Sequence, residues 1–183
     1  MINLSGKKVA VLLATGFEDL ELTEPVKALE TAGASVTLVG MNREDKRGVI
    51  GKHGTIARAD AAIDDVKAED FDALVIPGGR GPAKLREDQR ILDFTREIDQ
   101  AHKPLAAICH GPQVLASADL LKGKTATSYF TVSREVKKAG ANYVSRPVVV
   151  DGNLITSRMP RDIPVFIDAI LEALQPSVDA RMA

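Results

Sequence analysis

The chain has 183 residues, with 24 Lys and Arg against 25 Asp and Glu, and a net charge of −1 at pH 7. This length predicts one domain, spanning residues 1–183, that folds without a disulfide or a metal. The balanced charge and the 4% aromatic content argue against nucleic acid as a partner. Phosphate binding needs excess positive charge, and base stacking needs aromatic side chains.

The sequence also argues against a membrane protein. Its longest uninterrupted apolar run, Val9 to Ala14, is six residues, whereas a spanning helix needs roughly 18 or more. The first residues lack the apolar stretch and the cleavage site of a signal peptide, and a single Cys suits a reducing compartment, so we expect a cytoplasmic protein. Three scattered His offer no zinc spacing, and we expect neither metal nor cofactor.

Short apolar segments alternate with segments of helical periodicity along the chain. The expected strands are residues 7–14, 35–39, 73–76 and 105–108, followed by a hairpin of 148–150 with 154–156. The expected helices lie around residues 22–29, 91–98, 114–121 and 163–174, and the glycine-rich stretch 48–55 is expected to be a hairpin or an excursion. This alternation predicts an α/β layered fold around a mostly parallel sheet.

Three polar segments directly follow three of the expected strands. Residues 15–19 follow the first strand, residues 78–81 follow the third, and residues 109–112 follow the fourth. Ligands of an open parallel sheet bind at the carboxyl ends of its strands. An acid, a glycine-rich turn and the only thiol are therefore expected to meet at one edge, which makes this edge the candidate site.

Cys109 is the candidate nucleophile. It stands between an apolar strand and a helical segment, in a strand-to-helix elbow that exposes a nucleophile to the crevice. The dipole of the following helix favours negative charge at its N-terminus, so we expect it to lower the pKa of the thiol. The alternative is a buried and inert Cys. The elbow, together with the adjacent His110, favours a functional one.

Three further residues are candidates around this thiol. Glu18 is the candidate acid or base that faces the sulfur. The alternative is that the Glu-Asp pair before the helix does no more than cap it, and Asp19 is then the better cap. The backbone N–H groups of Gly79 and His110 are expected to form an oxyanion hole, unless Gly79 makes only a tight turn. His110 is also the candidate catalytic base, or a residue that only shapes the elbow.

These motifs resemble the PfpI family of the ThiJ/PfpI superfamily. The resemblance rests on six stretches that occur in the family's order: residues 17–21, 51–54, 71–80, 107–113, 148–153 and 156–162. It implies a flavodoxin-like three-layer α/β sandwich of the class I glutamine amidotransferase type. It also implies a homodimer or higher homo-oligomer with the active site near a subunit interface.

The resemblance also implies the roles of individual residues. It places the nucleophile at Cys109, the interacting carboxyl at Glu18 and the backbone donors at Gly79 and His110. The pocket wall then includes Gly78, Arg80 and Tyr129. Peptidases of the family complete a Cys-His-Glu triad with a Glu from the neighbouring subunit, and the aligned position here is Ala83, with Glu87 or Asp88 as possible substitutes.

Three functions stay open. The favoured one is a stress-response enzyme of the glyoxalase III or protein-deglycase type, in which Cys109 attacks a small reactive carbonyl and Glu18 moves protons. This chemistry needs no third triad acid, which suits Ala83. The second is an intracellular cysteine peptidase that uses Cys109 and His110 on peptides. The third is a redox sensor or chaperone without turnover, in which an exposed thiol is oxidised.

Overall fold

The computed structural model describes residues 1–176. Its main sheet has seven strands: β1 (Lys8–Leu13), β2 (Ser35–Gly40), β5 (Ala61–Ala62), β6 (Ala73–Ile76), β7 (Leu105–Ile108), β10 (Val148–Asp151) and β11 (Leu154–Ser157). Their order is β10-β11-β7-β6-β1-β2-β5, and every neighbouring pair is parallel except β10 with β11. The expected α/β fold with a mostly parallel sheet is confirmed.

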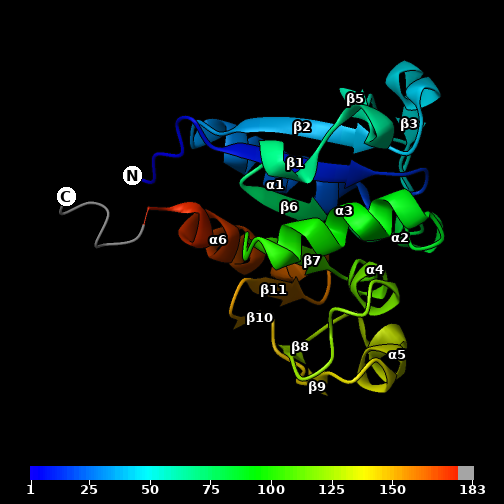
Figure 1. Cartoon of the computed structure of the whole chain (residues 1–183), viewed down its shortest axis with the longest axis vertical. Helices are drawn as coiled ribbons and strands as arrows, with labels where there is room; N and C mark the ends of the chain where they lie inside the picture. Colours follow the sequence, from blue (N-terminus) through cyan, green and yellow to red (C-terminus); the bar gives the residue numbers. More distant parts are fainter. Residues whose placement is uncertain (177–183) are drawn as a thin grey trace.

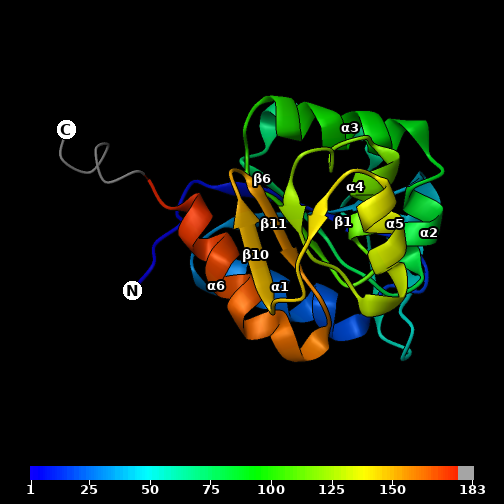
Figure 2. The ribbon, with the colours of Figure 1, turned by 90° about the horizontal axis from the view of Figure 1, so that it is seen from below.

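Helices cover both faces of this sheet (Figures 1 and 2). One face carries α1 (Asp19–Thr31) and α6 (Ile163–Leu174), and the other carries α2 (Gly81–Leu85), α3 (Gln89–Gln100) and α4 (Pro112–Ser117). Side chains alternate along a strand, so Val9 and Val11 of β1 pack toward α1 and α6, whereas Ala10 and Leu12 pack toward α3. The continuous apolar run of β1 is explained by burial on both faces.

The smaller elements lie outside the main sheet. A hairpin of β3 (Val49–Ile50) and β4 (Ile56–Ala57) confirms the expected excursion. A parallel pair of β8 (Thr125–Ala126) and β9 (Asn142–Tyr143) lies beside α5 (Ser133–Lys138). Single 3-10 turns occupy Arg43–Arg47, Ile63–Asp65, Ala68–Asp70, Phe130–Val132 and Pro160–Asp162.

The helix expected over residues 114–121 is wrong in its extent. Helix α4 ends at Ser117, and Asp119 takes a φ of +59°. A left-handed residue cannot continue a right-handed helix, which explains why the apolar residues up to Leu121 leave it. Helices α2 and α5 and the short strands β5, β8 and β9 were not expected, because elements of two to six residues are too short to show a period.

The strand order places the site. The chain leaves β1 toward β2 on one side and later enters β6 and β7 on the other side. The carboxyl ends of β1, β6 and β7 therefore lie side by side, next to the point where the winding direction reverses. Open α/β sheets bind their ligands in this crevice.

Candidate active site

Cys109 lies in a strained elbow immediately after β7. Its φ of +63° falls in the left-handed region, which non-glycine residues rarely adopt. Its backbone N–H still donates to the Ser157 carbonyl at 3.0 Å, as in the sheet, and the Gly111 N–H closes the turn on the Ile108 carbonyl at 2.8 Å. A Cβ on Gly111 would lie 2.6 Å from the Ile76 carbonyl oxygen. The turn therefore requires glycine at position 111, and the expected strand-to-helix elbow is present.

The carboxyl that faces Cys109 belongs to Glu21. This side chain is fully buried in the first turn of α1, and its Oε2 accepts a hydrogen bond from the Gly78 N–H at 2.8 Å. A Cβ on Gly78 would lie 2.5 Å from that oxygen and 2.7 Å from Cys109 Cβ. Gly78 thus lets the acid and the thiol approach each other. The expectation that Glu18 faces the sulfur was wrong, because the acid that faces it, Glu21, lies almost one helical turn further along the chain.

A signal for Glu21 exists in the sequence. Glu21, Pro25 and Leu29 are spaced four residues apart and lie on the same buried face of α1. A carboxyl on an otherwise apolar helix face is exceptional, because burying a charge without a partner is costly. Glu18 instead precedes α1 at its N-cap, with φ −73° and ψ 118°. Its backbone is extended rather than helical, so Glu18 does not share the buried face that carries Glu21.

Glu18 lies on the wall of the same pocket. Its side chain is almost buried and contacts two side chains of the β3–β4 loop, Lys52 Nζ at 3.4 Å and His53 Nε2 at 3.1 Å. The second contact gives His53, a residue of this loop, a side-chain partner. The Glu18 carboxylate therefore anchors the loop over the site.

Asp19 secures the same loop through its backbone. The expectation that Asp19 caps α1 was wrong, because its carboxylate accepts hydrogen bonds from the backbone N–H groups of His53 at 3.0 Å and Thr55 at 2.8 Å. Burial alone would raise the pKa of Asp19, but the hydrogen bonds from Thr55 and His53 outweigh it and lower that pKa. Glu18 thus binds side chains of this loop, and the adjacent Asp19 binds the backbone of the same loop.

The environment of the thiol differs from the expected one. Burial raises the pKa of Cys109, and the negative charge of Glu21 raises it further. The N–H groups of Gly79 and His110 donate to the sulfur and lower its pKa, but they do not offset burial. Helix α4 has only six residues, which limits its dipole. The expected lowering of the thiol pKa is therefore wrong for this arrangement.

The acid beside the thiol has an unusual pKa of its own. Burial raises the pKa of Glu21 to about 7, against the lowering effect of the hydrogen bond from Gly78, and the nearby charge of Glu18 adds to the increase. A carboxyl with this pKa exchanges its proton near neutral pH, which is the property of an effective general acid and base. Glu21 is consequently the acid-base candidate of the site.

His110 lies on the other side of the sulfur. Its Nδ1 is 3.3 Å from Cys109 Sγ, and its ring packs at 5.2 Å from the Tyr129 ring. Burial lowers the pKa of His110, and the positive charge of Lys52 lowers it further. A neutral imidazole at pH 7 is able to accept a proton, so the geometry allows the expected role of a base.

Cys109, His110 and Glu18 share one pocket of about 560 Å³, and the buried Glu21 lies behind its wall, against Gly78. The residues that line it are Glu18, Lys52, Gly79, Arg80, Ala83, Cys109, His110, Gln113, Tyr129 and Pro160. Gly78 was expected in the wall but lies behind it, against Glu21. Sequence reasoning missed Glu21, Lys52 and Gln113.

The expected position of the third triad acid is occupied by Ala83, which lines the pocket. Asp88 binds Arg90 through its carboxylate, and both Glu87 and Asp88 line a different hollow. Within residues 1–176 no carboxylate hydrogen-bonds to His110, whose polar contact is the Cys109 sulfur. One chain thus supplies a nucleophile and a base without an orienting acid.

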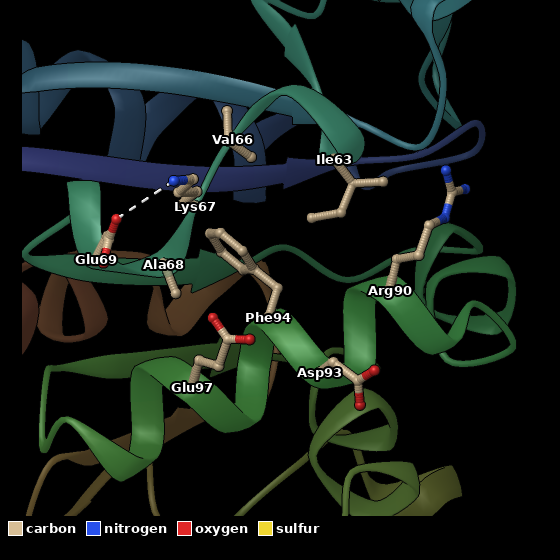
Figure 3. Close-up of a pocket in the computed structure, with 9 residues that line it drawn as sticks. All are labelled: Ile63, Val66, Lys67, Ala68, Glu69, Arg90, Asp93, Phe94 and Glu97. Carbon is tan, nitrogen blue, oxygen red and sulfur yellow. Dashed lines mark ion pairs between the residues drawn. The ribbon is translucent and has the colours of Figure 1, made fainter.

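A separate hollow of about 400 Å³ lies between residues 63–69 and α3 (Figure 3). The Phe94 ring points from α3 toward the segment that carries Val66 and Ala68, and Lys67 pairs with Glu69 at 3.7 Å on the rim. Its lining holds neither a thiol nor an imidazole. The nucleophilic chemistry is concentrated at Cys109.

The described residues form neither a metal cluster nor a membrane-spanning helix. Among residues 1–176, no three His, Cys, Asp or Glu side chains gather closely enough to hold a metal ion. No helix in this part of the chain combines the length and the apolar character that a membrane span requires.

Comparison with known proteins identifies the family. Residues 7–173, which contain the elbow, the glycine turn, Glu18 and Glu21, match the DJ-1/PfpI family. The chain belongs to the DJ-1/PfpI family. The resemblance found in the sequence is therefore confirmed, and homologues of this DJ-1/PfpI protein carry names that indicate enzymes.

Three similar proteins are informative. YraA of Bacillus subtilis, named as a candidate cysteine protease, is 51% identical over 160 residues, which are 87% of this chain and 94% of YraA. A deglycase of Thermococcus kodakarensis is 41% identical over 168 residues, covering 92% of this chain and 99% of the deglycase. The structure of Drosophila melanogaster DJ-1beta superposes with a TM-score of 0.85 at 34% identity, covering 92% of this chain and 90% of that one.

Proposed function

We propose that this DJ-1/PfpI protein is a cysteine-dependent enzyme of the glyoxalase III or protein-deglycase type that acts on reactive carbonyls. The observation that carries the proposal is the contact of one thiol, Cys109, with one acid, Glu21, whose pKa is about 7. Isomerisation of an α-oxoaldehyde needs a nucleophile and one group that both takes and returns protons. The similarity to a deglycase supports the same chemistry.

The reaction begins with attack by the sulfur of Cys109 on the aldehyde carbon of a substrate such as methylglyoxal. A C–S bond forms, and the ionised Glu21 takes the thiol proton and passes it to the new alkoxide, which gives a hemithioacetal. The N–H groups of Gly79 and His110, which donate to the sulfur in the free protein, are close enough to stabilise the developing oxyanion.

Glu21 then carries the proton transfers. Its carboxylate removes the proton from the sulfur-bearing carbon and returns a proton to the neighbouring carbon, while the hydroxyl proton moves from the oxygen of the first carbon to the oxygen of the second. The hemithioacetal thereby becomes a thioester with no change in overall oxidation state. One water, with its proton accepted by His110, hydrolyses the thioester. The C–S bond breaks, a hydroxyacid leaves, and the thiol takes the proton back.

A peptidase is the second candidate. The 3.3 Å contact between Cys109 and His110 and the similarity to YraA favour it. The alanine at position 83 argues against it, because a Cys-His pair without an orienting acid loses control of the imidazole tautomer. A redox sensor is less favoured, because Cys109 is only 6% exposed and its thiol pKa is raised, which suppresses oxidation.

Turnover measurements separate these functions. Wild type is expected to convert methylglyoxal to lactate, and Cys109→Ser is expected to abolish this activity. The proposal is wrong if Cys109→Ser keeps full turnover. Hydrolysis of a fluorogenic peptide that is lost in Cys109→Ala, in the absence of methylglyoxal turnover, would establish the peptidase instead.

A further inference from the structure

Lys52 is a positively charged side chain that the β3–β4 loop places on the wall of the active-site pocket. Its Nζ lies 3.4 Å from Oε2 of Glu18, and its side chain is 44% exposed, whereas that of Glu18 is 9% exposed. The lysine therefore reaches inward from the solvent to a nearly buried acid. The reaction described above assigns no role to this charge.

The backbone of the loop fixes the place of Lys52 on this wall. Its own N–H donates to the Phe17 carbonyl at 2.8 Å, which joins the loop to the segment that leads into α1. The preceding residue, Gly51, packs so closely that a Cβ there would collide with Oδ1 of Asp19. The same Asp19 carboxylate accepts two backbone N–H groups further along the loop. The lysine is thus held at a defined position beside the pocket.

The charge of Lys52 acts on both bases of the site. Burial lowers the pKa of His110, and the charge of Lys52 lowers it further. Burial raises the pKa of Glu21 to about 7 and the charge of Glu18 adds to the increase, whereas the charge of Lys52 opposes it. A positive charge favours the deprotonated form of any titratable group near it. One lysine therefore favours the form in which each of the two groups accepts a proton.

Other titratable or charged groups surround the two bases. They either line the pocket or contact the Glu18 carboxylate, and they are Glu18, His53, Arg80, Cys109 and Tyr129. Of this set, Glu18 carries the charge that opposes Lys52 at Glu21. The two partners of one ion pair thus have opposite effects on the same buried acid.

We propose that Lys52 is a positioning residue that favours the proton-free forms of Glu21 and His110 near neutral pH. This inference rests on the proposed function, in which Glu21 takes protons from sulfur and carbon and His110 takes one from water. The partial exposure of Lys52 allows solvent and salt to weaken its effect, which limits it to a moderate one. The β3–β4 loop then contributes a charge to the chemistry as well as a cover over the pocket.

The test compares two variants that break the same ion pair. Lys52→Met removes the positive charge, so both bases keep their protons to higher pH. We expect the ratio of kcat/KM at pH 6 to kcat/KM at pH 8, with methylglyoxal, to fall about threefold, the change in a base's proton-free population for roughly half a pH unit. Glu18→Gln removes the negative charge instead, which should lower the pKa of Glu21 and raise this ratio. A loosened loop alone would change both variants in the same direction.

Two further variants serve as controls. Lys52→Arg keeps the charge and should restore the wild-type ratio. Lys67→Met is the matched control, because Lys67 also pairs with an acid, Glu69, at 3.7 Å but lines the hollow beside α3. Its substitution should leave the ratio unchanged.

The imidazole of His110 gives a readout that needs no turnover. Its NMR titration, assigned among the three His by comparison with His110→Gln, should move to higher pH in Lys52→Met but not in Lys67→Met. An unmoved titration in Lys52→Met, or a ratio that changes in the same direction in Lys52→Met and Glu18→Gln, would overturn the inference while the proposed function stands. Full turnover in Cys109→Ser, or a wild type without turnover, would overturn the proposed function, and the titration would still show whether Lys52 sets the charge of His110.

Discussion

The Glu21 carboxyl lies against the Cys109 side chain, and its negative charge raises the pKa of the thiol. Both side chains approach through the space left by Gly78, whose N–H binds the carboxylate at 2.8 Å. Since the pKa of Glu21 is about 7, its charge changes near neutral pH. The reactivity of the sulfur is therefore governed by this neighbour more than by helix α4.

Glu21→Gln should make the thiol more reactive. The amide removes the negative charge and donates a hydrogen bond to a thiolate, so the pKa of Cys109 falls. We expect alkylation by iodoacetamide at pH 8 to accelerate at least about tenfold, since one pKa unit changes the thiolate population tenfold. The chain has one Cys, so intact-mass measurement reports this site alone. An unchanged or slower rate would show that Glu21 does not control the thiol.

Stability should fall as pH rises through the titration of Glu21. The folded pKa of about 7 lies above the ordinary value of 4.5, so the folded state binds more protons than the unfolded state between these values. The stabilising contribution is complete below pH 4.5 and is lost toward pH 7, by about 3 kcal/mol. Urea unfolding at a series of pH values measures this loss. Glu21→Gln should lack it, and an identical pH profile in the variant would refute the assignment.

The sequence predicted most of the fold and about half of the site. Long apolar strands and the glycine turns that follow them reveal the sheet and its carboxyl edge directly. Glu21 was missed because Glu18 and Glu21 both lie at the start of the same helix, and only the buried face of α1 distinguishes them. The thiol pKa could not be predicted either, because it depends on burial and on a contact between residues 88 positions apart in the chain.

Asp19→Asn should loosen the β3–β4 loop. The carboxylate accepts two backbone N–H groups, and an amide replaces these charge-assisted bonds poorly. We expect a loss of about 1–3 kcal/mol in the free energy of unfolding at pH 7. Because the folded pKa is lowered, this contribution is present above the ordinary pKa and disappears as pH falls below it. Equal stability of variant and wild type at pH 7 would contradict this role.

The backbone of Cys109 should store strain. Its φ of +63° costs about 1–2 kcal/mol for a residue that carries a Cβ, and glycine avoids that cost. Cys109→Gly is therefore expected to be more stable than Cys109→Ala by about 1 kcal/mol in urea unfolding, the reverse of the order seen in ordinary helices. Greater stability of the alanine variant would mean that the elbow is unstrained.

The central claim is that Glu21, and not Glu18, is the general acid and base. The most direct test compares the turnover of methylglyoxal by Glu21→Gln and by Glu18→Gln at pH 7. The account predicts that Glu21→Gln loses at least about 100-fold in kcat, the contribution of a general acid and base, although its thiol is more reactive. Glu18→Gln, which alters the wall and its contacts with Lys52 and His53, should keep most of its turnover. Wild-type turnover in Glu21→Gln, or an equal loss in Glu18→Gln, would contradict the account.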